Sequence, residues 1–415
     1  MSMHLAAADK ASQSLRTRYR DVRSLSEALA RPLSAEDQCV QSMPDASPAK
    51  WHLAHTTWFF EKIILSQSKS YKPFNARFDE LFNSYYLGLG MPFSRPNRGL
   101  LTRPNVTEVM DYRCHVDRAM GEVLETGAPA DAIELGLNHE QQHQELLLTD
   151  IKHAFSCNPL LPAYLPATPS RVESAPLLTW VDHSGGEAAI GHEGPNFAFD
   201  NEKPRHAVRL RSFRIASRLV TCGEYSEFIE DGGYRRSELW LSDGWALAQN
   251  ENWQAPLYWL PNSQIFTLQG ARPLNPAEPV VHVSFYEAAA YAAWAGKRLP
   301  TEFEWEVASE GISPPGHFLD DNFLRPRAAE GRAPLEQMFG DAWEWTRSSY
   351  DPYPGYRPFD GALAEYNGKF MVGQIVLRGG SCATPPGHIR STYRNFFPPA
   401  ARWQFSGIRL AEDLR

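Results

Sequence analysis

Two histidines separated by one helical turn are the residues of this sequence best suited to chemistry. His139 and His143 lie in the run 132–155, which carries leucines at helical intervals. On a helix, residues four apart point the same way one turn apart, so both imidazoles could bind one metal ion. Neutral imidazoles suit zinc, iron, nickel or copper and need at least one further ligand. Two hydrogen-bonded histidines in a helical core are the alternative interpretation.

A third histidine ligand is available in the run 48–67, which is also predicted to be helical. His55 shares a face of this helix with Trp58 and Phe59. His52 lies about 60° from His55 around the axis, nearer the polar flank. We therefore expect His55, rather than His52, to complete the metal site.

Amphipathic helices must position these histidines. Apolar residues recur at three- and four-residue steps, which predicts helices over residues 11–30, 48–67, 107–125 and 132–155. The second of these is expected to start with Ser47 as the N-cap and Pro48 at the first helical position. Four such helices form a bundle, and metal sites in bundles are built from side chains of facing helices.

The segment 74–104 interrupts the helical pattern and is too long and too aromatic for a bare connector. It contains the pair Tyr85 and Tyr86, followed by Arg95 and Arg98. We expect it to fold over the metal site, because loops held on a rigid scaffold often carry functional residues. Packing of the tyrosines and a surface position for the arginines are the alternatives.

The second half of the chain has a different composition. Prolines cluster in the segment 161–176, which predicts a linker. Glycine, tryptophan and short β-rich runs follow, with strands expected near 177–181, 207–210 and 213–216, and helices near 222–231 and 284–295. The expected fold class is therefore α+β.

Length and composition restrict the function. The chain has 415 residues, of which 43% are hydrophobic and 22% charged, and these values indicate two or three globular domains. A net charge of −8 argues against a nucleic-acid or anionic-membrane surface. Because there is neither an apolar run long enough for a membrane span nor an N-terminal signal core, we expect a cytoplasmic protein acting on small molecules.

An ordered series of motifs identifies the second half with a known fold. They lie at residues 199–206, 220–225, 279–284, 297–306, 340–345, 378–381 and 407–409. This series resembles the formylglycine-generating-enzyme-like (sulfatase-modifying-factor) fold, a variant of the C-type-lectin architecture. The resemblance does not extend to formylglycine formation, because the stretch 391–397 lacks the cysteine pair which those enzymes use.

With the histidine motifs added, the whole chain resembles the non-haem iron sulfoxide synthases of ergothioneine biosynthesis. The resemblance implies a DinB-like four-helix bundle over 1–160, a linker over 161–176 and a formylglycine-generating-enzyme-like domain over 177–415. It implies Fe(II) bound by His55, His139 and His143, with O2 as co-substrate. Glu145 lies about 160° around the helix from His143, so we expect it to support the helix rather than bind the metal.

The reaction implied by this family joins C2 of the imidazole of hercynine, which is Nα-trimethylhistidine, to the sulfur of a small thiol and yields a sulfoxide. Gln142 would then hydrogen-bond the hercynine imidazole. The segment Asn395, Phe396 and Phe397 resembles the part of the family that holds the betaine end, where an aromatic face can attract the trimethylammonium group. Ordinary core packing is the alternative for both phenylalanines.

The resemblance also gives roles to the loop 74–104. Tyr85 or Tyr86 would supply a proton at the active site. Arg95 or Arg98 would pair with a carboxylate of the thiol substrate, with cysteine favoured over γ-glutamylcysteine. Selenoneine synthases, which join hercynine to a selenosugar, are close relatives of this branch and are an alternative.

Two other classes of function fit the same residues. DinB-like bundles also include metal-dependent thiol transferases, which would work without O2. A non-catalytic binding protein, in which the histidines only brace the bundle, is the third possibility.

Overall fold

The computed structural model describes residues 2–126, 129–167, 174–312, 316–319 and 323–414, with only the backbone described for residues 2–14. The chain divides into two compact units. The first comprises Met1–Pro159 together with Asp360–Glu365, and the second comprises Leu160–Phe359 and Tyr366–Arg415. Part of the proline-rich segment, residues 168–173, lies outside the described residues. No helix in the described part of the chain is long and apolar enough to cross a membrane.

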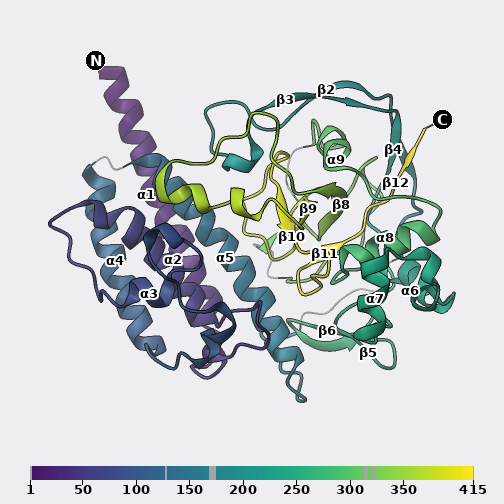
Figure 1. The fold of residues 1–415 in the computed structure, drawn as a ribbon, viewed down its shortest axis with the longest axis horizontal. Coiled ribbons are helices and arrows are strands. Elements are labelled where there is room, and N and C mark those ends of the chain that lie inside the picture. The colour runs from purple at the N-terminus through teal and green to yellow at the C-terminus, as the bar shows by residue number, and fades with distance from the viewer. Residues whose placement is uncertain (1, 127–128, 168–173, 313–315, 320–322, 415) are drawn as a thin grey trace. The chain divides into compact units, whose positions relative to one another are not determined.

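The first unit is a helical bundle (Figure 1). Its long helices are α1 (Ser2–Ala30), α2 (Ala49–Ile63), α4 (Val106–Thr126) and α5 (Ala130–Ser156). All four helices predicted from the hydrophobic pattern are confirmed, although α2 ends at Ile63 and continues only as a 3-10 turn, Leu65–Gln67. Helix α2 packs against both α4 and α5, and α1 packs against α5.

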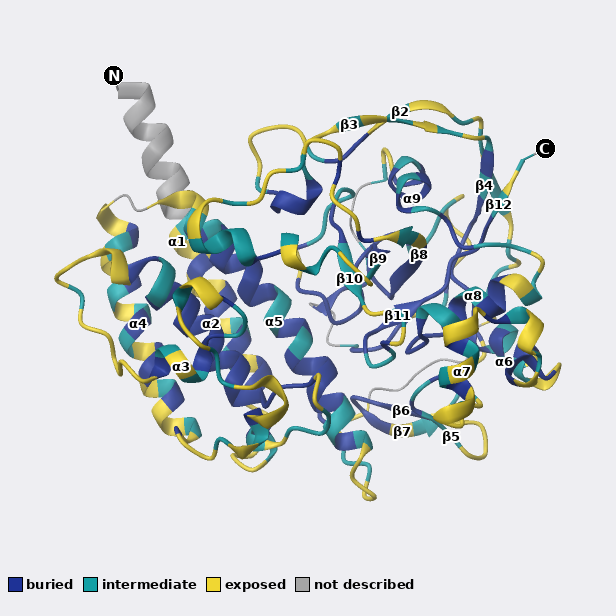
Figure 2. Cartoon of the chain, in the orientation of Figure 1, coloured by how far each residue is buried: buried dark blue, intermediate teal, exposed yellow. Residues whose placement is uncertain are grey.

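Helix α2 is covered on all sides. Every residue from Ala49 to Glu61 is buried, which Figure 2 shows as dark blue along this helix. A helix that is buried all round has no polar flank. The expectation that His52 lies nearer a polar flank is therefore wrong, since its side chain is as buried as those of its neighbours.

The start of α2 also differs from the prediction. The helix begins at Ala49, with Pro48 at the N-cap and no capping side chain. Ser47 is engaged by distant residues instead, because its backbone N–H donates to the Asp150 carboxylate at 2.8 Å and its hydroxyl accepts from Arg98 at 2.9 Å. Long-range partners have replaced the local cap.

The segment between α2 and α4 contains the short helices α3 (Phe78–Phe82), η3 (Leu87–Leu89) and η4 (Arg95–Leu100). The buried carboxylate of Glu61 on α2 holds its first part in place. This carboxylate accepts hydrogen bonds from the Tyr71 hydroxyl at 2.7 Å and the Phe74 N–H at 3.1 Å. It also accepts one from Tyr112 of α4 at 2.6 Å. The segment is therefore packed onto the bundle rather than free.

The second unit combines small sheets with short helices, which confirms the α+β class. Its helices are α6 (Cys222–Glu230), α7 (Ser242–Asn250), α8 (Phe285–Trp294) and α9 (Glu302–Ala308). One sheet has the order β10-β9-β8-β11, formed by Asn395–Phe397, Ile375–Arg378, Trp343–Ser349 and Ser406–Gly407. A second has the order β1-β4-β12, formed by Trp180–His183, Phe213–Ala216 and Ala411–Asp413. The remaining described strands are β2 (Gly186–Ile190), β3 (His206–Leu210), β5 (Trp259–Leu260), β6 (Gln264–Thr267) and β7 (Gly270–Pro273).

Most local expectations for this unit hold. The strands expected near 207–210 and 213–216 are β3 and β4, whereas the strand expected near 177–181 starts only at Trp180. The helix expected near 222–231 is α6, and Thr221 caps it by accepting the N–H of Glu224 at 3.2 Å. The helix expected near 284–295 is α8, capped by Ser284.

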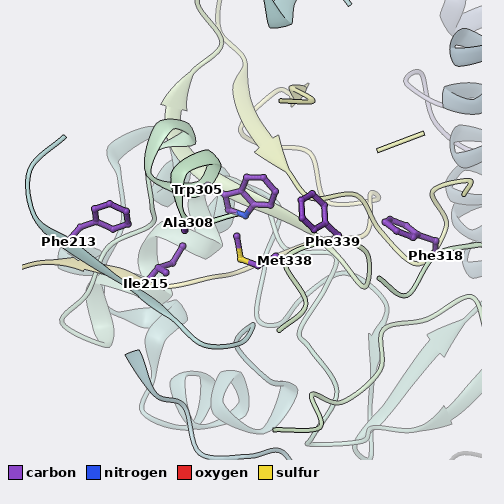
Figure 3. Packing of buried hydrophobic residues seen from close by; sticks show 7 residues of the cluster. All are labelled: Phe213, Ile215, Trp305, Ala308, Phe318, Met338 and Phe339. Carbon is purple, nitrogen blue, oxygen red and sulfur yellow. The ribbon is translucent and has the colours of Figure 1, made fainter. Parts of the chain in front are cut away.

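The apolar core of the second unit contains Phe213, Ile215, Trp305, Ala308, Phe318, Met338 and Phe339 (Figure 3). Its central indole is also fixed by a polar contact, because the Trp305 ring N–H donates to the buried Glu344 carboxylate at 2.8 Å. Arg409 forms a bidentate pair with the same carboxylate, with both bonds at 2.8 Å. Three sequence motifs therefore meet in one buried ion pair.

We predict that His388 makes the stability of the second unit depend on pH. Its ring is buried, with Nε2 at 3.1 Å from the Tyr393 hydroxyl, and burial together with the charge of Arg390 lowers its pKa to about 3. The folded pKa lies below the unfolded value, so this contribution is fully present above about pH 6.5 and is lost as the pH falls toward 3. Between pH 7 and pH 5 the loss should be about 2 kcal/mol.

Urea unfolding of wild type and His388→Gln at these two pH values measures this contribution. The variant should be the less stable protein at pH 7, and the difference should shrink by that amount at pH 5. An equal difference at both pH values would contradict the assignment.

Candidate metal centre

Three histidines from two helices meet in the first unit. His55 is on α2, and His139 and His143 are on α5. One ring nitrogen from each lies within 4.8 Å of the others, and Nε2 of His55 is 3.2 Å from Nε2 of His139. The structure therefore brings together the three histidines chosen from the sequence, and among the described residues this is the one group of His, Cys, Asp or Glu side chains with such spacing.

The environment keeps these imidazoles neutral. Burial lowers the pKa of His139 to about 3. Burial and the neighbouring histidines hold the pKa values of His55 and His143 well below the usual range. His55 and His139 are fully enclosed, whereas His143 is partly exposed. Neutral imidazole is the form that binds metals, so the cluster is ready to coordinate a cation near neutral pH.

Hydrogen bonding also orients one of the three histidines. Nδ1 of His55 is 2.6 Å from the backbone carbonyl oxygen of Phe82, which can only accept, so Nδ1 carries the proton. The lone pair of His55 is then on Nε2, the atom that faces His139. Metal-binding histidines characteristically donate their other ring N–H in this way, and the donor set fits a divalent transition metal.

His52 and Asp150 adjoin the cluster. The sequence pattern indicates His52 only as a possible metal ligand, and Asp150 was not identified from it. Nδ1 of His52 is 2.9 Å from Nδ1 of His143, and Nε2 of His52 is 3.1 Å from the Asp150 carboxylate. Asp150 follows His143 by seven residues, which is two helical turns and hence the same stripe of α5. That spacing is the sequence signal which could have identified Asp150.

A buried carboxylate fixes the rotation of α5. Glu140 accepts hydrogen bonds from Arg23 at 2.9 Å, Ser26 at 2.6 Å and Arg113 at 3.0 Å. Burial alone would raise the pKa of Glu140, but the charges of the two arginines outweigh it and the pKa is lowered. Glu140 is thus fully engaged by α1 and α4, and the helix presents its histidines to α2.

The two arginines of the loop lie in different environments. The Arg98 guanidinium is buried and lies 3.4 Å from the ring centroid of Trp51. It donates to the hydroxyls of Ser47 at 2.9 Å and Ser84 at 3.3 Å, and burial lowers its pKa to about 9. Trp51 in turn stacks on His55, with ring centroids 4.6 Å apart. Arg95 is exposed and donates to the backbone carbonyl of Asp45.

The tyrosine pair also adjoins rings that surround the histidines. Tyr86 is fully buried and packs against Trp58, with centroids 5.8 Å apart, while Trp58 stacks on His55. Tyr85 is partly exposed and stacks on Tyr86, with ring centroids 4.6 Å apart.

The two other predicted residues of α5 differ in exposure. Gln142 is partly exposed, whereas Glu145 is buried.

The remaining predicted substrate-binding residues belong to the second unit. Asn395, Phe396 and Phe397 form β10, which pairs antiparallel with β9. Phe396 stacks face to face on Tyr350 with centroids 4.0 Å apart, and Phe397 meets Trp403 edge-on at 5.8 Å. One face of Phe396 is thus already engaged in packing.

We predict that the protein binds one divalent metal ion per chain through the three histidines. His55→Ala removes a buried ligand and should weaken Zn(II) or Fe(II) binding by more than about 100-fold, a larger effect than losing an outer-shell partner. His153→Ala is the matched control, because His153 also lies on α5 but bonds Ser42 rather than the cluster. Equilibrium dialysis with elemental analysis measures both. Metal-free wild type, or unchanged binding by His55→Ala, would contradict the assignment.

Known proteins match both halves of the chain. The DinB superfamily model matches residues 18–147, and the model for the sulfatase-modifying factor enzyme 1-like domain matches residues 167–333 and 327–414. A formylglycine-generating enzyme of Streptomyces coelicolor is 29% identical, covering 52% of this chain and 81% of its own.

Other relatives match nearly the whole chain. The hercynine oxygenase of Mycolicibacterium smegmatis is 34% identical, covering 90% of this chain and 93% of its own. The hercynine oxygenase of Mycobacterium tuberculosis is also 34% identical, covering 94% and 98%. The chain therefore belongs to the hercynine oxygenase family, in which a DinB-type helical domain precedes a domain of the sulfatase-modifying-factor type.

Proposed function

We propose that this protein is a non-haem Fe(II) enzyme that uses O2 to join C2 of the hercynine imidazole to the sulfur of a small thiol, giving a sulfoxide. The observation that carries the proposal is the buried, neutral three-histidine cluster in a chain 34% identical to hercynine oxygenases along almost its full length. The reaction balances. One oxygen atom of O2 enters the sulfoxide, and the other leaves as water with the hydrogens of C2–H and S–H.

His55, His139 and His143 would hold the iron, which supplies the redox chemistry with O2 and a site for the deprotonated sulfur. Three neutral ligands leave the positive charge of the ion uncompensated, so the cluster favours an anionic substrate group. The protein then has to orient two substrates and supply protons.

The candidate residues for binding hercynine are Gln142 and the segment Asn395–Phe397. Gln142 precedes His143 on α5 and is partly exposed, so its amide can hydrogen-bond the substrate imidazole. Asn395, Phe396 and Phe397 would hold the betaine end. Phe397 is the better candidate for a cation–π contact with the trimethylammonium group, because Tyr350 covers one face of Phe396 at 4.0 Å.

The thiol substrate would be bound through its carboxylate by Arg98. This guanidinium is buried beside Trp51. Among the described residues, no carboxylate hydrogen-bonds it and its Nε has no hydrogen-bond partner. A buried cation of this kind gains most from a bidentate anionic ligand. This supports cysteine over a selenosugar, which has no carboxylate. Arg95 is the weaker candidate because it is exposed.

Tyr85 or Tyr86 would supply the proton required by the oxygen that is reduced. A phenol can donate this proton without adding a resting charge to the site. Tyr86 is held among aromatic rings, and the Tyr86 N–H bonds to the Asn83 side chain at 3.0 Å. The pair is therefore held firmly enough to act from a fixed position.

We predict coupling of hercynine to cysteine by the Fe(II)-reconstituted protein. The protein is reconstituted anaerobically and given hercynine, O2 and, separately, cysteine, γ-glutamylcysteine or a selenosugar, with products identified by mass spectrometry. A sulfoxide from cysteine supports the proposal, and a product only from the selenosugar would make the chain a selenoneine synthase. Thiol transfer without O2 but with zinc or nickel would favour a thiol transferase, and no product in any arm would contradict all three.

We also predict that Arg98, and not Arg95, sets the affinity for the thiol. Arg98→Lys keeps a positive charge but removes the planar fork, which should raise the KM for cysteine about 10- to 100-fold, the value of one charge-assisted hydrogen bond or slightly more. Arg95→Lys is the matched control and should leave KM within about twofold, as expected for an exposed site. Equal effects of the two substitutions on KM would reject the assignment.

A further inference from the structure

His52 joins two residues of α5 through its two ring nitrogens. Its side chain is buried, and its ring centroid lies 5.2 Å from that of His143. Nδ1 is 2.9 Å from Nδ1 of His143, and Nε2 is 3.1 Å from Asp150. Asp150 is also buried and accepts the backbone N–H of Ser47 at 2.8 Å. The three side chains form a continuous row from a carboxylate to a metal-site histidine.

The positions of the protons along this row follow from the Asp150 carboxylate at one end. An ionised carboxylate can only accept, so the proton between Asp150 and His52 is on Nε2 of His52. In the tautomer of His52 that carries its one proton on Nε2, Nδ1 has a lone pair and accepts from Nδ1–H of His143, 2.9 Å away. His143 is left with its lone pair on Nε2.

We propose that His52 and Asp150 are positioning residues that hold His143 in the Nδ1-protonated tautomer, with Nε2 free to bind the metal. The inference rests on the proposed metal centre, but not on which substrates the enzyme couples. Neither residue touches the reacting atoms, since His52 acts through His143 and Asp150 acts through His52.

The Nδ1-protonated tautomer of His55 is fixed by a different kind of acceptor. Its Nδ1 proton is held by the backbone carbonyl of Phe82 at 2.6 Å, which no substitution can remove. For His143 the acceptor is the side chain of His52, which in turn donates to the carboxylate of Asp150. A carboxylate paired with a ligand histidine through hydrogen bonds fixes its ring orientation and raises its basicity as a ligand.

His52 is poorly placed to be a fourth ligand. Both of its ring nitrogens are already engaged, one by His143 and the other by Asp150. The group of potential ligands whose nitrogen atoms converge contains His55, His139 and His143 but not His52. Its position therefore suits an outer support better than direct coordination.

Substitutions of His52 separate this role from simple packing. In His52→Asn the amide oxygen can take the place of Nδ1 and still accept from His143. In His52→Gln the amide reaches the position of Nε2 instead, and His52→Phe provides neither group. We expect the His52→Asn protein to bind Zn(II) with an affinity within about threefold of wild type. The His52→Gln and His52→Phe proteins should bind Zn(II) about 10- to 100-fold more weakly, as is typical when an outer-shell partner of a metal ligand is lost.

Competition with a chromophoric chelator measures these affinities in the full-length protein. The control is His153→Phe on α5, the helix that carries His143 and Asp150. A pure packing role predicts the opposite order, because asparagine leaves the largest void. Equal weakening by all three substitutions, or none by any, would overturn the proposal.

The wild-type protein provides a second test that needs no variant to fold. Nitrogen NMR of metal-free protein labelled in histidine should show the proton of His143 on Nδ1 and that of His52 on Nε2, with signals assigned by loss in His143→Gln and His52→Gln. A proton on Nε2 of His143 would contradict the proposal. If the tautomers are as stated but no coupled product forms in the substrate panel, the proposed reaction is wrong and this inference stands.

Discussion

The first unit depends on the buried carboxylate of Glu140. Arg23 and Arg113 pair with it, and the same two guanidinium groups donate to Thr57 at 3.0 Å and to the Leu53 carbonyl at 3.1 Å on α2. One anion thus ties together all four long helices and fixes how each is rotated. Removing one member of such a network leaves an uncompensated buried charge, which typically costs 3–5 kcal/mol. Glu140 is next to His139, so the rotation it fixes is the one that turns the histidines toward α2.

The same burial has opposite consequences for neighbouring groups on α5. It would neutralise Glu140, but two arginines keep that side chain ionised. It acts with little opposition on the histidines, whose pKa values fall well below the usual range. Because the carboxylate is already saturated by cations of the protein, it is not available to a metal, and the available donors are neutral nitrogens. The separation of a structural face from a metal-binding face on one helix is therefore electrostatic as well as geometric.

The long helices could be predicted from the sequence because they follow from local periodicity, and the structure also brings together the three histidines chosen as metal ligands. The three- and four-residue steps predict the four long helices of the bundle but not the short α3, and the four-residue spacing predicts that His139 and His143 share a face. The partners of those histidines could not be predicted in the same way. The helical pattern predicts that His52 lies near a polar flank, but α2 is buried from Ala49 to Glu61. Ser47 was expected to cap α2, but Asp150 and Arg98 engage it across the fold.

The charge balance of the proposed metal site bears on the proposed choice of substrate. Three neutral histidines do not compensate a divalent ion, and Arg98 adds a further positive charge behind Trp51. The Asp150 carboxylate beside the cluster is engaged by His52 and Ser47 and offsets only part of this charge. A site with surplus positive charge and little water stabilises anions, because each interaction is stronger in a medium of low dielectric constant. A thiolate that also carries a carboxylate satisfies both cations at once, whereas a neutral sugar donor leaves the guanidinium without a counter-charge. This charge balance supports the proposal that the second substrate is an amino-acid thiol.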